Sequence, residues 1–117
     1  MKKVILTGIL LTLAAFALSA QNLPSIRIVN NTGYSIYSLY VSPSDSDLWG
    51  DDLLEEDILE NGQTFTYRLP KPLNEKNVYD IGAEDEDGDV YFKWKVTINN
   101  NARIIFTADD MDAEDSD

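Results

Sequence analysis

The stretch VYFKWKVTI, residues 90–98, alternates apolar and other side chains more regularly than any other part of this 117-residue sequence. Alternation with a period of two is typical of a β-strand that has one buried face. We therefore predict a strand over residues 90–98. Its buried face is predicted to carry Val90, Phe92, Trp94, Val96 and Ile98, and its exposed face Tyr91, Lys93, Lys95 and Thr97.

On either side of this segment, further stretches have the composition and spacing of strands, and turn-forming residues separate them. They cover residues 25–30, 34–41, 64–69, 78–83 and 103–107. The stretch 34–41 is apolar on both faces, which favours a place in the middle of a sheet. The pattern predicts an all-β fold of about six strands, mostly antiparallel, that is either a sandwich or a partly closed barrel.

The segment 51–60 gives two conflicting signals. Apolar side chains four residues apart, together with the capping-box spacing of Asp52 and Glu55, predict one short helix after the Trp49-Gly50 pair. The Asn61-Gly62 pair instead favours a hairpin turn that would join this segment to the following strand. Both interpretations place the end of the segment against the core.

The first 20 residues are typical of a cleavable signal peptide. Lys2 and Lys3 form a basic start, residues 4–18 are uncharged and mostly apolar, and the small Ser19 and Ala20 follow. A membrane-spanning helix needs about 20 apolar residues, more than this run contains. Cleavage is predicted after Ala20 or after Ser19. The protein is therefore predicted to be exported, and to be periplasmic or secreted.

Residues 21–108 are predicted to form a single β domain, and residues 109–117 a disordered acidic tail. Removal of the signal peptide leaves seven basic and 21 acidic residues, a formal charge of −14 instead of the −12 of the whole chain. This charge repels nucleic acids and anionic membrane surfaces. The expected partners are therefore cations or basic protein surfaces, and the expected state is a monomer without a membrane span.

The chain contains neither Cys nor His. Zinc, copper and iron sites favour thiolate and imidazole ligands, so these metals are not expected. Serine and cysteine hydrolases of the Ser-His-Asp and Cys-His types are excluded for the same reason. Calcium, which binds oxygen ligands, is the one cofactor that the composition favours.

Residues 84–89, EDEDGD, form the strongest candidate metal site. Five carboxylates in six residues repel one another, and a bound calcium ion would relieve that repulsion. The predicted ligands are Asp85, Asp87 and Asp89, joined across space by Asp45 and Asp47. The glycine does not fall where an EF-hand loop requires it. The alternative is an exposed hairpin turn whose charges keep it soluble.

A second acidic cluster surrounds Trp49 and includes Asp51 and Asp52. A tryptophan on an irregular loop is suited to stack on a sugar or on the cation of a partner, so these three residues are candidate binding residues. The alternative is that Trp49 folds back and covers the edge of the core.

Six short segments follow one another in a characteristic order: NNTG at 30–33, LYVSPS at 39–44, WGDDLL at 49–54, NGQ at 61–63, YDI at 79–81 and DEDG at 85–88. This pattern resembles a family of small exported bacterial domains with no established activity. The resemblance covers about residues 26–106. It implies a single exported domain and no catalytic residues. If the Ser-Pro-Ser loop, the Trp-Gly segment and the Asp-Gly turn meet at one end of the fold, they form an acidic rim around Trp49.

These observations favour a non-enzymatic exported binding module, with calcium as its best-defined ligand. One alternative is an accessory or inhibitor module that binds a basic exported protein through charge complementarity. The other is a small hydrolase with paired carboxylates, which would need a cleft that holds two acids at a set separation. A domain of this size offers little room for such a cleft.

Overall fold

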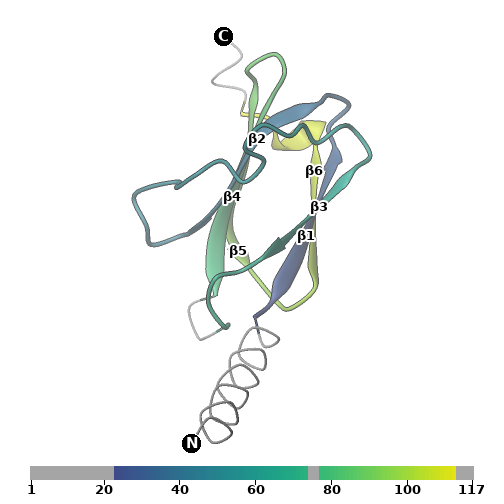
Figure 1. The fold of residues 1–117 in the computed structure, drawn as a ribbon. Coiled ribbons are helices and arrows are strands. Elements are labelled where there is room, and N and C mark those ends of the chain that lie inside the picture. The colour runs from purple at the N-terminus through teal and green to yellow at the C-terminus, as the bar shows by residue number, and fades with distance from the viewer. Residues whose placement is uncertain (1–22, 74–76, 113–117) are drawn as a thin grey trace, which may run out of the picture.

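The computed structural model describes residues 23–73 and 77–112. It confirms the all-β prediction, with six strands in two sheets (Figure 1). The predicted signal peptide lies outside the described residues. Over the described ranges, no helix is long and apolar enough to cross a membrane.

The strands agree with the predicted segments to within two residues at each end. They are β1 (Ser25–Asn31), β2 (Ile36–Pro43), β3 (Thr64–Arg68), β4 (Val78–Asp85), β5 (Val90–Thr97) and β6 (Ala102–Thr107), and one 3-10 turn, η1 (Ala108–Asp110), follows them.

The strands form two three-stranded sheets, with the order β3-β1-β6 in sheet A and β2-β4-β5 in sheet B. Sheet B is antiparallel throughout, whereas β1 pairs antiparallel with β3 and parallel with β6. The sheets form two layers (Figure 1) and do not close into a barrel. The sandwich is therefore the correct one of the two predicted architectures.

The core lies between the layers and takes its side chains from both sheets and from the loops between them. Across the interface, the rings of Tyr91 and Phe106 meet edge to face, with centroids 6.4 Å apart. The buried apolar residues are Ile26, Ile28, Val29, Ile36, Leu39, Leu54, Leu59, Leu69, Ile81, Ala83, Tyr91, Ile98, Ile104 and Phe106. No disulfide assists this packing, because the chain has no cysteine.

The prediction of which β5 side chains are buried is wrong for the first half of the strand. Tyr91 is completely buried, whereas the Trp94 side chain is 58% exposed. The cause is a β-bulge, at which the register of β4 against β5 shifts between Tyr79 and Ile81. Lys95 has a positive φ of 53°, and its N–H donates a hydrogen bond of 2.9 Å to the Asp80 carboxylate. The extra residue reverses the alternation, as bulges do.

The predicted short helix over residues 51–60 is also wrong, because this segment forms turns. The Asp52 carboxylate accepts hydrogen bonds from the N–H groups of Leu39 and Leu54 instead of capping a helix. Glu55 has a φ of 57°, a left-handed conformation that a right-handed helix cannot contain.

The same segment covers the free edge of β2, which lies at the rim of sheet B and not in its middle as predicted. The Leu53 N–H donates to the Leu39 carbonyl, and Leu59 pairs with Ile36 through hydrogen bonds of 2.8 and 2.9 Å. The two apolar faces of β2 have separate causes: Ile36 and Leu39 are buried in the core, and Tyr40 lies on the outer surface described below. A covered rim also protects the sheet from pairing with other chains.

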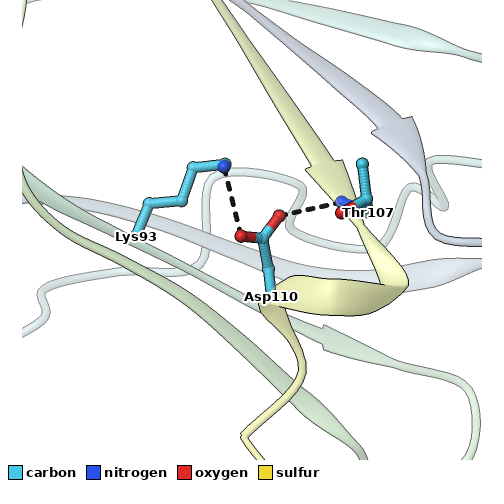
Figure 2. Close-up of polar contacts among 3 residues, drawn as sticks. All are labelled: Lys93, Thr107 and Asp110. Atoms are coloured by element: carbon cyan, nitrogen blue, oxygen red, sulfur yellow. Dashed lines mark hydrogen bonds and ion pairs between the residues drawn. The ribbon is translucent and has the colours of Figure 1, made fainter.

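The predicted disorder from residue 109 onward is wrong for residues 109–112. Asp110 accepts hydrogen bonds from the Lys93 ammonium at 3.2 Å and from the Thr107 N–H at 2.9 Å (Figure 2). Met111 then pairs with Tyr91 of β5. This C-terminal segment links the end of sheet A to sheet B. Residues 113–117 lie outside the described residues.

Candidate functional site

The turn between β4 and β5, residues 85–89, is built around the Asp85 side chain. One carboxylate oxygen of Asp85 accepts hydrogen bonds from the N–H groups of Asp87 and Asp89, at 2.9 and 3.0 Å. The turn is closed by main-chain hydrogen bonds from Gly88 to Asp85 and from Asp85 to Asp89. Gly88 has a φ of 85°, the conformation that glycine adopts without strain. The hairpin turn predicted at this position is therefore present.

Asp85 is only 3% exposed, and its second carboxylate oxygen also accepts a hydrogen bond. The Tyr91 hydroxyl donates to this oxygen at 2.7 Å. Burial, followed by the hydrogen bond to Asp85, raises the pKa of Tyr91 well above its usual range, because both disfavour the phenolate. The buried carboxylate is thus held in one orientation by three donors.

The three predicted calcium ligands of this turn lie together. One carboxylate oxygen each from Asp85, Asp87 and Asp89 fall within 4.8 Å of one another. Calcium binds oxygen at about 2.3–2.6 Å, so two oxygens on one ion are at most about 5 Å apart. The arrangement is therefore compatible with a shared cation. Asp87 is exposed and Asp89 half-buried, so the site opens to solvent.

Asp45 and Asp47 are not part of this cluster, and the predicted five-residue composite site does not form. Their loop is attached to the start of β4, where the Ser44 N–H donates to the Val78 carbonyl. Asp85 ends β4, seven residues further on. A strand rises about 3.4 Å per residue, so the two loops are separated by roughly 24 Å. For the same reason the Ser-Pro-Ser loop and the Asp-Gly turn do not meet in one acidic rim.

Trp49 lies on the outer face of sheet B, the face that points away from the core. The cross-strand register places Gly82 of β4 between Tyr40 of β2 and Phe92 of β5. Glycine leaves a gap in this row, and the Trp49 ring fills it. A Cβ atom on Gly82 would lie 3.3 Å from that ring. Trp49 stacks on Phe92 at 5.8 Å between centroids.

The other two candidate binding residues, Asp51 and Asp52, do not lie on the aromatic surface with Trp49. Asp51 is exposed. Asp52 is engaged with Leu39 and Leu54, as described above, so it fixes the segment that carries Trp49. The Ser42 hydroxyl adds a second anchor by donating to the Leu48 carbonyl at 2.7 Å. Of the predicted trio, Trp49 contributes an aromatic surface and Asp52 holds it in place.

A hollow with a volume of about 390 Å³ adjoins the Trp49 ring on this outer face. Its lining is mostly apolar and consists of Tyr40, Trp49, Gly50, Gly82, Ala83, Glu84, Val90 and Phe92. We call it the aromatic hollow. Next to the row that contains Gly82, the paired residues are Ser38 of β2, Glu84 of β4 and Val90 of β5. The Ser38 side chain is small, so it leaves space open beside the aromatic rings.

This hollow is not evident from the sequence, because the alternation in residues 90–98 assigns Phe92 to the core. One signal was present in the sequence: Gly82 interrupts a strand, and a glycine there often marks a close approach by another group. Its link to Trp49, more than 30 positions earlier, is a tertiary contact. No local pattern contains that information.

A scan against protein-family models gives no match to this chain, and a search of curated proteins gives none either. A search of solved structures finds similarity to the NMR structure of a protein from Eubacterium rectale. The two chains share 12% sequence identity, and the alignment covers 75% of this chain and 80% of the other, with a TM-score of 0.56. At this identity the similarity supports the fold alone.

Proposed function

We propose that the protein is a non-enzymatic, exported binding module that binds calcium through Asp85, Asp87 and Asp89. The observation that carries this proposal is the convergence of three carboxylate oxygens around a buried, oriented Asp85. Close carboxylates repel one another, and a divalent cation between them removes that repulsion. The excess of acidic residues in the chain also attracts cations.

The site is expected to be weak and solvated. Three hydrogen bonds already occupy most of the acceptor capacity of Asp85, which leaves it one coordination position. Calcium takes six to eight oxygens, so water would have to supply several of them. Dissociation constants of about 10⁻⁴–10⁻³ M are typical of such extracellular sites.

The test is thermal unfolding of the mature protein in calcium, in magnesium and in chelator. At 100 times its dissociation constant, a ligand that binds only the folded state adds about 2.7 kcal/mol to the free energy of unfolding. We expect calcium to raise the melting temperature, and magnesium to raise it less because magnesium loses its water reluctantly. If export occurs as proposed, the purified protein begins at Ala20 or Gln21.

Two variants distinguish calcium binding at this site from a general screening of the acidic charge by the cation. Asp87→Asn removes one ligand oxygen charge and leaves the hydrogen bonds to Asp85 in place, so it should abolish the calcium effect. Glu86→Gln removes an exposed charge in the same turn that is not one of the three ligands. It should keep the effect. Coincident melting curves in calcium and chelator, or an equal loss in both variants, would refute the proposal.

A further inference from the structure

We propose that the aromatic hollow on the outer face of sheet B binds a small organic cation with an alkylated ammonium group. This site is separate from the calcium ligands proposed above and does not depend on them. The chemistry of its walls, its charge and its construction support the proposal.

The walls combine aromatic rings with a single charged group. Tyr40, Trp49 and Phe92 supply π systems, and Glu84 is the one ionisable carboxylate in the lining. Among the residues that the structure describes, no lysine or arginine lines the hollow. Aromatic faces attract cations, and tryptophan does so most strongly. An alkylated ammonium fits such walls because its methyl groups contact apolar surface while its charge interacts with the rings and the carboxylate.

The sparse polar lining argues against a sugar as the preferred ligand. A sugar presents hydroxyl groups all around its ring, and each buried hydroxyl needs a hydrogen-bond partner. Apart from main-chain groups, the described lining side chains offer only the Glu84 carboxylate, the Tyr40 hydroxyl and the Trp49 indole N–H. An alkylated ammonium makes no such demand. The acidic surplus of the chain adds long-range attraction for a cation.

Ring contacts and hydrogen bonds hold the walls of the hollow in place. The Trp49 ring is in contact with Tyr40, Phe92 and Trp94, with centroids between 5.6 and 6.2 Å apart. The segment before and after it is fixed by Ser42 and by Asp52. Its volume of about 390 Å³ falls within the usual range of small-molecule sites, about 300–1,000 Å³. A ligand therefore meets walls that need little rearrangement.

The test is a titration with choline, followed by tryptophan fluorescence, with chelator present so that the calcium site plays no part. Three matched probes accompany it: the uncharged isostere of choline in which carbon replaces nitrogen, methyl glucoside, and sodium chloride at equal ionic strength. We expect saturable binding of choline and at least tenfold weaker binding of the isostere. Equal binding of choline and the isostere, preferential binding of the glucoside, or no response to choline would overturn the proposal.

Three variants locate the signal. Glu84→Gln should weaken choline binding by up to about fivefold, the range of a solvent-exposed ion pair. Glu86→Gln changes an exposed acid outside the lining and should leave the affinity unchanged. Trp94→Phe leaves Trp49 as the sole tryptophan and should retain the fluorescence change. Equal weakening by both glutamate variants, or loss of the signal in Trp94→Phe, would place binding elsewhere and contradict the proposal.

Discussion

At the scale of single residues, several polar side chains that the sequence pattern assigns to turns or to the surface are buried, and their hydrogen bonds hold the main chain in place. Asn30 is completely buried, and its amide donates to the carbonyls of Tyr34 and Leu59 at 2.7 and 2.8 Å. Its oxygen accepts from the N–H and the hydroxyl of Thr32. Asp85 has a similar role in the 85–89 turn. Polar groups of this kind can be buried because their donors and acceptors have hydrogen-bond partners inside the protein.

The Asp85–Tyr91 pair makes stability depend on pH in the alkaline range. The pKa of Tyr91 is raised in the folded state, so the folded protein keeps this proton where the unfolded chain loses it. The resulting stabilisation is complete below the usual tyrosine pKa of 10.0 and is lost as the pH rises above it. We expect the free energy of unfolding to fall by about 1.4 kcal/mol per pH unit above pH 10 from this group.

Urea unfolding of the wild type and of Tyr91→Phe between pH 8 and 11 measures this dependence. The variant should be less stable at pH 8, because the buried Asp85 oxygen loses its donor, and should show a shallower alkaline slope. Tyr37→Phe changes a tyrosine that is 46% exposed and serves as the control. Parallel slopes in the wild type and Tyr91→Phe would mean that Tyr91 ionises as freely in the folded state as in the unfolded chain.

At the scale of the elements, strand positions could be predicted from the sequence and side-chain direction in β5 could not. Short-range alternation and turn residues locate strands, and these signals are local. The direction of Phe92 and Trp94 depends on the bulge at Lys95, which is stabilised by Asp80 on the neighbouring strand. The same applies to residues 51–60, where contacts with β2 outweigh a weak helical pattern.

Because of the bulge, we can predict whether a glycine substitution at Lys95 raises or lowers the free energy of unfolding. A non-glycine residue with a φ of 53° is strained by about 1 kcal/mol, and glycine removes that strain. We therefore expect Lys95→Gly to match or exceed the wild type in stability by up to about 1 kcal/mol. In a regular strand the same change would destabilise by about 1 kcal/mol.

Urea unfolding of Lys95→Gly checks this expectation, and Lys95→Ala controls for the loss of the charged side chain. Thr97→Gly, at an exposed position in the same strand without a positive φ, should be destabilised. A destabilisation of Lys95→Gly equal to that of Thr97→Gly would show that β5 is regular at this point.

At the scale of the whole molecule, the two layers are joined by a contact between their edges in addition to the core. Lys93 belongs to sheet B, and Asp110 follows the last strand of sheet A (Figure 2). Both side chains keep some exposure, 26% and 19%, so solvent screens the pair. The Lys93 ammonium also lies 5.8 Å from the centroid of the Phe106 ring.

A double-mutant cycle with Lys93→Met and Asp110→Asn measures this contact. We expect a coupling energy of about 0.5–1 kcal/mol that decreases at high salt, since partly exposed ion pairs are screened. Asp109→Asn changes an exposed neighbouring acid and should show no coupling to Lys93→Met. A coupling energy of zero at low salt would mean that the Lys93–Asp110 pair adds nothing to the cohesion of the two layers.

The parallel pairing of β1 with β6 has a consequence for how the protein acquires its shape. Ile26 lies opposite Ala102, so the first strand gains its second neighbour only when a segment about 75 positions later has been made and brought back to it. Closing so long a loop costs conformational entropy before any contact compensates it. Assembly of this layer must therefore wait until β6 has been made, and pieces that end before residue 102 are left with one edge of β1 unpaired.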